Sequence, residues 1–287
     1  MRLGVVGMLP ADITTVTPGQ LEAIRGPRLT GAGFHAPVDR LSELPAASCR
    51  KVCSAFASAG VDLVQFGLGY AGCLFDPDTQ VRDQLLGQIE RGVEVSRELG
   101  AQVCLIRTGS LSPRGSYSPS RRNLDPASRE RLIESLRRIG RKAEAEGVTM
   151  VIETHLLTIM DSPESCAAIV RQTDSPAIRL VLDYVNHFQT LSQVYHSTER
   201  LHHIFDRMGP IAGVGHLKDL RVGEGLVLHL EEAAPGEGEL DLATVLERWD
   251  RLYTDGYMLL EHLPDDQYPR AGAHVHRVAG AAGIDIH

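Results

Sequence analysis

The sequence predicts a single (β/α)8 TIM barrel over residues 1–287. Eight short apolar runs alternate with eight amphipathic or charge-rich stretches, which is the pattern of βα units around a parallel sheet. The apolar runs are nearly continuous in Val, Ile, Leu, Met and Phe, as expected for strands covered on both faces. A barrel of this kind takes roughly 250 residues as one domain. No composition break or Ser/Gly-rich linker divides the chain, so we expect one domain.

The predicted strands lie where the apolar runs are. In chain order they cover residues 3–8, 29–35, 61–67, 103–108, 149–155, 179–184, 213–218 and 257–262. An open doubly wound sheet more often has about five to seven strands, so eight units favour a closed barrel.

Eight predicted helices separate these strands. They cover residues 18–25, 47–59, 78–99, 126–146, 163–172, 198–208, 242–253 and 268–279. Asp125 and Ser162 each precede a proline, which predicts an N-cap followed by proline at the first helical position. Four glycines stand just before the next strand, where a left-handed helix cap favours glycine: Gly60, Gly100, Gly147 and Gly256.

The composition is typical of a globular protein with a small-molecule partner. The hydrophobic fraction is 43% and the charged fraction 23%. The net charge of -8 and the pI near 5.8 argue against binding to nucleic acid, which usually requires a basic surface. No segment reaches the roughly 20 apolar residues of a membrane span, and the first residues lack a signal-peptide pattern. We therefore expect a cytoplasmic protein that binds neither nucleic acid nor membrane, and the odd count of five cysteines predicts reduced thiols.

Ionisable residues end four consecutive predicted strands. Each directly follows two small or apolar residues, and the four are Glu153, Asp183, His216 and Glu261. The carboxyl ends of barrel strands meet at one rim, where a buried carboxylate needs a compensating cation. Three carboxylates and one imidazole suit Mn²⁺, Mg²⁺ or Co²⁺. The sequence therefore predicts one divalent metal ion, manganese in the first place, held by these four residues.

A single acid at such a position has a simpler explanation, because it could cap a helix or pair with an arginine at the barrel mouth. Four ionisable residues on successive strands favour the shared metal site. The segment 235–239, Pro-Gly-Glu-Gly-Glu, lacks the Lys-Ser/Thr of a phosphate loop, and its glutamates would repel an anion. We expect a surface loop there.

Three motifs in the second half of the chain resemble the xylose-isomerase-like superfamily of sugar isomerases and epimerases. They are Ile-Ala-Gly-Val-Gly-His-Leu-Lys-Asp at 211–219, Pro-Gly-Glu-Gly-Glu-Leu-Asp at 235–241 and Asp-Gly-Tyr-Met-Leu-Leu-Glu-His at 255–262. The resemblance spans the chain but is specific only from about Val148 onward. It implies the same four metal ligands, with Glu153 and Glu261 as the acid/base pair that moves a proton through an enediolate.

Two positions depart from the epimerases of that superfamily. Asn186 stands three residues after Asp183, where those epimerases usually have histidine, and His187 follows one step later. Ile159 stands where they carry a second glutamate. The resemblance therefore leaves the handling of substrate open.

Other polar residues complete the predicted site. His155 follows Glu153 by two positions, and Lys218 follows His216 by two and so points to the same side of its strand. We expect both in catalysis, with Lys218 neutralising an oxyanion or phosphate unless it pairs with Asp219. Five residues are predicted to contact the substrate: Asn186, His187, Arg107, Gln65 and His35.

The leading hypothesis is a metal-dependent sugar isomerase or epimerase, and the alternative is a metal-dependent lyase. In the lyase the same intermediate would expel a hydroxyl or aglycone from the next carbon, with His155, Lys218 or His187 as the acid. Apurinic endonucleases of the superfamily use extra histidines where this chain has Gln65 and Arg107, which argues against a nuclease. The partner is expected to be a carbohydrate, and the resemblance is compatible with a homo-oligomer.

Overall fold

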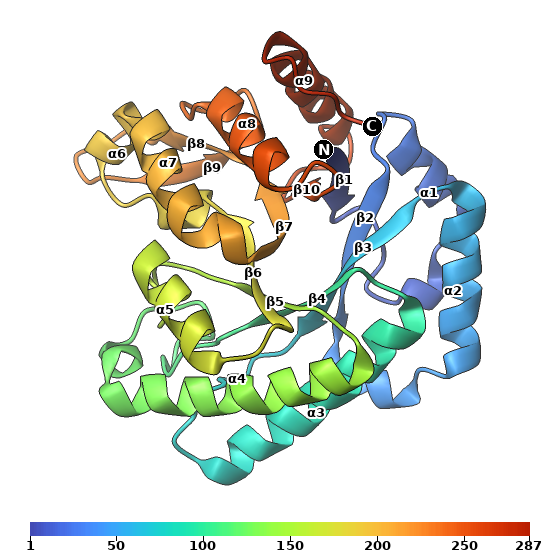
Figure 1. Cartoon of the computed structure of the whole chain (residues 1–287), viewed down its shortest axis with the longest axis vertical. Coiled ribbons are helices and arrows are strands. Elements are labelled where there is room, and N and C mark those ends of the chain that lie inside the picture. Colours follow the sequence, from blue (N-terminus) through green and yellow to red (C-terminus); the bar gives the residue numbers. More distant parts are fainter.

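The computed structural model describes all 287 residues and shows eight parallel strands closed into a barrel. Around the barrel the order is β1-β10-β7-β6-β5-β4-β3-β2, so each strand pairs with its neighbours along the chain once the short β8 and β9 are set aside. The barrel strands are β1 (Arg2–Val6), β2 (Gly31–Pro37), β3 (Asp62–Gly69), β4 (Val103–Arg107), β5 (Met150–Glu153), β6 (Ile178–Asp183), β7 (Ala212–Leu217) and β10 (Tyr257–Leu260). The predicted (β/α)8 barrel is confirmed (Figure 1).

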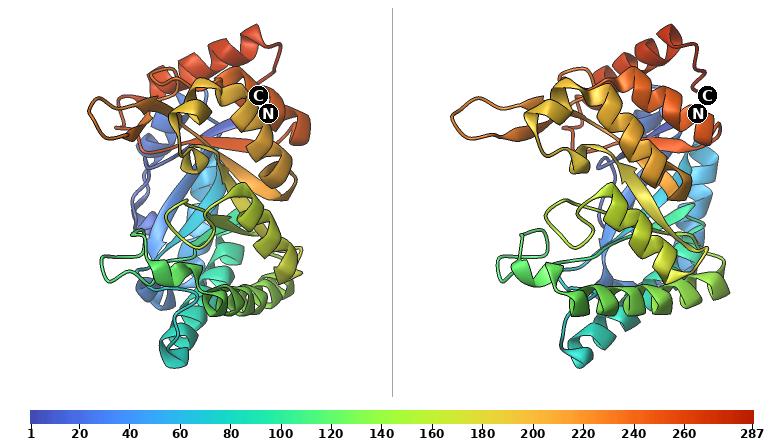
Figure 2. Two further views of the ribbon diagram at one scale, coloured as in Figure 1. Left: turned by 90° about the vertical axis from the view of Figure 1, so that its left-hand side faces the viewer. Right: turned by 60° about the vertical axis from the view of Figure 1, so that its left-hand side comes forward.

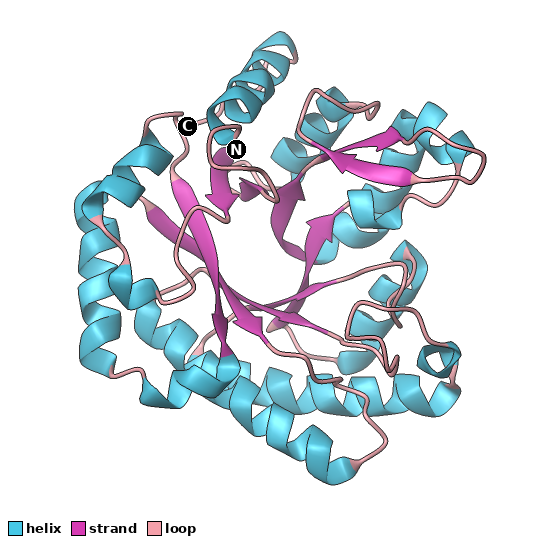
Figure 3. Cartoon of the chain, turned by 180° about the vertical axis from the view of Figure 1, so that it is seen from behind, coloured by secondary structure: helices cyan, strands magenta, loops and turns pink.

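Helices surround the strands on the outside of the barrel (Figure 3). They are α1 (Pro18–Arg25), α2 (Ala46–Ala59), α3 (Thr79–Leu99), α4 (Pro126–Glu146), α5 (Pro163–Thr173), α6 (Leu191–Tyr195), α7 (Ser197–Met208), α8 (Leu242–Leu252) and α9 (Tyr268–Ala281). Five 3-10 turns join them: η1 (Ile13–Thr15), η2 (Val38–Glu43), η3 (Arg121–Leu124), η4 (Val185–His187) and η5 (Gly209–Ile211). Only the short α6 has no counterpart among the predicted helices.

An antiparallel hairpin of β8 (Asp219–Val222) and β9 (Leu230–Ala233) follows β7 and was not predicted. The hairpin and the loop between β4 and α4 project on the same side of the barrel (Figure 2). Each hairpin strand has only four residues, and β9 reads Leu-Glu-Glu-Ala. Such short, charged strands lack the apolar periodicity from which strands are recognised.

A glycine caps three of the helices as predicted, whereas the prediction that Gly256 caps a helix is wrong. Gly60, Gly100 and Gly147 have φ of 63°, 65° and 68°, which is the left-handed cap. Gly256 has no positive φ, and α8 ends earlier, at Leu252. Glycine is required there for space, because a Cβ at this position would lie 2.5 Å from Cβ of Tyr253.

The two helices with proline at the first position differ in their caps. The Ser162 hydroxyl accepts the Ser165 N–H, and the Ser165 hydroxyl donates to Asp161 while accepting the Ser162 N–H, so α5 begins with a capping box. The Asp125 side chain accepts no hydrogen bond from α4. The prediction of an N-cap is therefore confirmed for Ser162 and wrong for the Asp125 side chain.

Two apolar clusters support the barrel. The larger, of 69 residues, lies mainly between the strands and the helices. The smaller fills the barrel interior and consists of Val6, Val64, Val103, Leu105, Val151, Val181, Val214, Tyr257 and Leu259. All five cysteines are free, as expected. None of the helices combines the length and the apolar character that a membrane span requires.

The capping box gives a stability prediction. Ser162→Ala should lower the free energy of unfolding by about 1 kcal/mol, because it removes the acceptor for an N-terminal N–H of α5. Asp125→Ala is the matched control, since Asp125 also precedes a proline but accepts no such bond. Urea unfolding followed by circular dichroism measures both. Equal destabilisation by the two variants would contradict the assignment of the cap.

Candidate metal centre and substrate cavity

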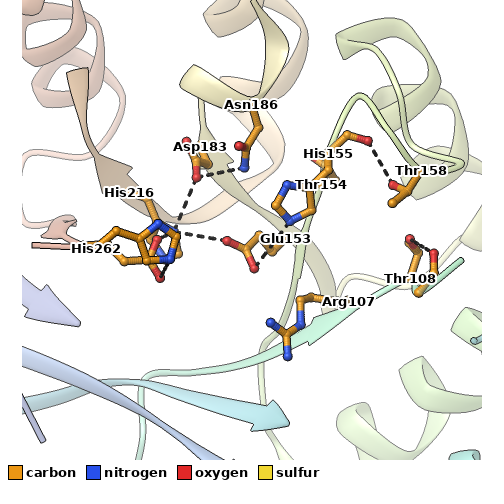
Figure 4. Close-up of polar contacts among 12 residues, drawn as sticks. Arg107, Thr108, Glu153, Thr154, His155, Thr158, Asp183, Asn186, His216 and His262 are labelled. Atoms are coloured by element: carbon orange, nitrogen blue, oxygen red, sulfur yellow. Dashed lines mark hydrogen bonds and ion pairs between the residues drawn. The ribbon is translucent and has the colours of Figure 1, made fainter. Parts of the chain in front are cut away.

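The period of two along a strand brings the four predicted ligands together. Val151, Val181, Val214 and Leu259 belong to the interior cluster, and two positions later on each strand come Glu153, Asp183, His216 and Glu261. Because alternate residues point to the same side, all four side chains point into the barrel just above this apolar layer. One ligand atom of each lies within 4.8 Å of the others, and all four residues are buried. Figure 4 shows Glu153, Asp183 and His216 converging.

The imidazole of His216 is oriented by Gln65. His216 Nε2 lies 2.9 Å from Gln65 Oε1, a carboxamide oxygen that only accepts, so the ring proton is on Nε2. Nδ1 then faces the acids, at 2.9 Å from Glu261 Oε2, 3.7 Å from Glu153 Oε1 and 3.9 Å from Asp183 Oδ2. A histidine ligand is commonly held in this way, through its second ring nitrogen. Gln65, predicted as a substrate contact, is placed behind the metal centre.

The charges of the buried cluster favour a cation between the four side chains. Burial raises the pKa of the Asp183 and Glu261 carboxyls, but Lys218 and His216 outweigh it and hold both pKa values below their usual range. Burial also opposes the charged form of Glu153, whose pKa the neighbouring His155 and His216 lower. Burial lowers the pKa of His216, and the surrounding carboxylates reverse this and raise it to about 10.

The donor set fits a divalent cation. Asp183 Oδ1 is buried without a hydrogen-bond partner, and Glu261 Oε2 and His216 Nδ1 face each other at 2.9 Å without an aligned hydrogen bond. With His216 neutral, as a metal ligand must be, the three carboxylates and the Lys218 ammonium leave a net charge of −2, which a divalent ion would neutralise. Carboxylate oxygens with one imidazole suit manganese, magnesium or cobalt.

Lys218 is part of the cluster and not a partner of Asp219. Its Nζ lies 2.9 Å from both Asp183 Oδ2 and Glu261 Oε2, and 3.4 Å from Glu232 Oε2 on β9. These acids outweigh the effect of burial and raise the pKa of Lys218 well above its usual value. Glu232 was missed by the sequence analysis because the strand that carries it was not recognised.

Asp219 instead organises the segment 235–239. Its carboxylate accepts the N–H groups of Gly236 at 3.0 Å, Gly238 at 3.1 Å and Leu240 at 3.1 Å. A Cβ on Gly238 would lie 2.3 Å from Asp219 Oδ1, so glycine is required for this approach. The expectation of a simple surface loop is therefore incomplete: the loop does surround an anion, and the anion is the chain's own carboxylate.

An aromatic side chain that the sequence did not single out connects two predicted site residues. The guanidinium of Arg107 lies 4.8 Å from the ring centroid of Tyr117, and that ring meets His155 edge-on at 5.4 Å. His155 Nε2 is 3.8 Å from Glu153 Oε2. Figure 4 shows Arg107 and His155 beside Glu153. Tyr117 lies in the loop between β4 and α4, which has no periodic pattern to indicate its position.

The other residues predicted to contact the substrate differ in how deeply they are buried. The Asn186 amide donates to Asp183 Oδ2 at 2.9 Å and is half-buried at the mouth. His187 is fully buried, 2.9 Å from the Thr154 hydroxyl, and burial lowers its pKa to about 4. His35 is half-buried, and burial lowers its pKa also. Asn186 is therefore accessible at the mouth of the barrel, whereas His187 is not.

Comparison with known proteins agrees with this geometry. The profile of the family described as "Xylose isomerase-like TIM barrel" matches residues 29–278. The chain belongs to this family. It is 27% identical over 250 residues to a putative hydroxypyruvate isomerase of Streptomyces coelicolor, covering 81% of this chain and 78% of that protein. It is 24% identical over 180 residues to an inosose dehydratase of Geobacillus thermodenitrificans, covering 57% of this chain and 58% of that relative's length.

Among solved structures, the barrel resembles 3-keto-D-glucoside 4-epimerase from E. coli, with a TM-score of 0.71 at 18% identity. The alignment covers 96% of this chain and 99% of the other. At this identity the similarity concerns the fold.

The orientation of His216 can be tested through metal affinity. Gln65→Leu removes the acceptor of the Nε2–H group and should weaken Mn²⁺ binding by about 10- to 100-fold. Gln102→Leu is the control, because this glutamine contacts Asp62 at the opposite end of the barrel. Calorimetric titration of metal-stripped protein measures both affinities. Unchanged affinity in Gln65→Leu would show that the contact does not support a metal ligand.

Proposed function

We propose that this protein is a divalent-metal-dependent isomerase or epimerase of a sugar or keto-sugar. The observation that carries the proposal is the arrangement of the two glutamates in the buried cluster. Glu153 at the end of β5 and Glu261 directly after β10 stand at the two ends of an arc, with Asp183 on β6 and His216 on β7 between them. A substrate held over this arc has a carboxylate on each side.

The metal proposed for this site is Mn²⁺, with Mg²⁺ or Co²⁺ as alternatives, and the ligands are Glu153, Asp183, His216 and Glu261. A bound divalent ion supplies a Lewis acid that polarises a carbonyl and acidifies the neighbouring C–H group. One glutamate then takes the proton from that carbon, and the other returns a proton to the adjacent carbon or to the opposite face. No atom is gained or lost, which is the balance of an isomerase.

Residues around the arc provide the polar contacts. The Lys218 ammonium, 2.9 Å from Asp183 and Glu261, stabilises the negative charge that develops on the substrate oxygen. The Arg107 guanidinium pairs with no carboxylate and faces Tyr117, so its donors are available to hydroxyl groups. His155, Asn186 and His35 stand at the same rim and complete the polar surface that a carbohydrate requires.

A lyase is the second candidate, and His155 is the observation that favours it. Its Nε2 is buried without a hydrogen-bond partner beside Glu153. With Glu153 as base, the C–H electrons would form a C=C bond while the C–O bond at the next carbon breaks. The hydroxyl would leave as water with a proton from His155. The dehydratase relative and the presence of Asn186 and buried Ile159 at the two epimerase positions are compatible with this reaction.

The acid/base roles give a direct test. Glu153→Gln and Glu261→Gln should each lower turnover by at least about 100-fold, because neither amide transfers the proton. Glu231→Gln is the control, since Glu231 is exposed on β9 and pairs with Arg221. Ketoses, inososes and keto-glucosides are incubated with Mn²⁺-loaded protein in D₂O, and products are analysed by mass spectrometry.

The mass of the products distinguishes the two reactions, and the turnover of the variants tests the acid/base pair. An isomerase or epimerase adds deuterium without loss of water, whereas a dehydratase yields a product about 18 Da lighter. Near-normal turnover in either glutamate variant would remove the proposed acid/base pair. Loss of turnover in Glu231→Gln as well would indicate an unspecific effect of charge.

A further inference from the structure

An apolar cavity of about 290 Å³ opens beside the metal centre. Its walls come from segments far apart in the chain: Leu157 after β5, Val185 and Phe188 around η4, Leu220 on β8 and Leu230 on β9. The unpredicted hairpin therefore forms one side of the cavity. Tyr117, which is 44% exposed, stands at its edge.

The polar residues that line the cavity lie next to the metal centre. Three of these residues are polar, and each contacts a residue of the buried cluster. Asn186 donates to Asp183 at 2.9 Å, and His155 Nε2 lies 3.8 Å from Glu153. Glu232 lies 3.4 Å from the Lys218 ammonium. A molecule with one end at the carboxylates would thus extend its other end into the apolar part.

The chemistry of the walls differs from what a simple sugar needs. A monosaccharide carries hydroxyl groups around its ring, and these would lose hydrogen bonds to water against leucine and phenylalanine. An apolar cavity of about 150 Å³ is enough to hold a benzene ring. A site of nearly twice this volume, with a tyrosine at its edge, suits an aromatic or similarly sized apolar group.

Another cavity, of about 330 Å³, lies against the outer face of β2 and β3, between Phe34, Ala36 and Phe66 and the η1 and η2 turns. None of the metal-centre residues lines it. Since the interior-facing Gln65 alternates with Phe66, this cavity is on the other side of the strands and does not extend the active site.

We propose that the cavity beside the metal centre binds the apolar aglycone of a glycoside substrate whose sugar ring lies over the carboxylates. This inference rests on the proposed function and names the substrate class: a glycoside, in its oxidised keto form for the proton-transfer chemistry, with a phenyl-sized or larger apolar substituent. The sugar part is recognised by the polar rim, and the substituent by the leucines and Phe188.

Paired glycosides that differ only in the substituent test this inference. Phenyl and methyl β-glycosides of D-glucose, D-galactose and D-xylose are titrated against Mn²⁺-loaded protein by calorimetry. In the pair whose sugar fits the rim, the phenyl glycoside should bind about tenfold more tightly or better, because its ring is buried in the cavity. Equal affinities within all three pairs would overturn the proposal.

Variants locate the binding site. Leu157, 47% exposed, and the half-buried Leu230 tolerate polar replacement, so Leu157→Ser and Leu230→Ser should keep the fold. Each should reduce the phenyl-over-methyl preference by at least about threefold, with the methyl glycoside unaffected. Leu252→Ser, at the exposed end of α8, should keep the full preference. A preference that both cavity variants retain would place the phenyl group elsewhere and overturn the proposal.

Solvent deuterium exchange separates this inference from the proposed function. Equal phenyl and methyl affinities in a protein that exchanges deuterium into a keto-sugar would contradict the aglycone site alone. A phenyl preference lost in Leu157→Ser, in a protein without exchange on any keto-sugar, would support the aglycone site and contradict the isomerase.

Discussion

The structure depends on how three buried carboxylates are neutralised at the carboxyl end of the barrel. Removing a carboxylate from water costs several kcal/mol unless opposite charge is close. Glu153, Asp183 and Glu261 share one buried imidazole and one buried ammonium, and with a neutral imidazole their summed charge with Lys218 is −2. A cation at their centre would neutralise this charge, and in the proposed reaction the same cation would polarise the substrate's carbonyl. The buried carboxylates that need a nearby cation in the folded protein would therefore be the same ones that hold the cation for the proposed reaction.

The barrel provides the rigid support for this arrangement. Each of the four cluster residues lies two positions after an interior valine or leucine, so the apolar layer beneath sets both the direction and the depth of the charged layer. Beyond the barrel strands, the loops after β4 and β5 and the β8–β9 hairpin form the mouth of the barrel. The division agrees with the general behaviour of such barrels, in which strands hold the reactive groups and loops select the substrate.

Residues that end an apolar run were predictable from the sequence, and residues on charged or irregular segments were not. The four residues of the buried cluster could be found because buried parallel strands read as apolar runs, and an acid or histidine at the end of each run is conspicuous. Glu232 and Tyr117 were not predicted, since β9 reads Leu-Glu-Glu-Ala without an apolar run and the loop after β4 has no periodic pattern. Gly256 looked like a helix cap, but tertiary packing against Tyr253 explains it. Lys218 was placed on the correct side of its strand, whereas its partners depend on contacts across the barrel that spacing along the chain does not show.

The metal content of the purified protein tests the central claim most directly. Wild-type protein and Asp183→Ala are loaded with Mn²⁺, passed through gel filtration and analysed by inductively coupled plasma mass spectrometry, with Asp255→Ala as a control at an exposed aspartate. We predict one manganese ion per chain in the wild type and the control, and none in Asp183→Ala. A wild type that retains no divalent metal, or an Asp183→Ala protein that retains as much as the wild type, would contradict the account.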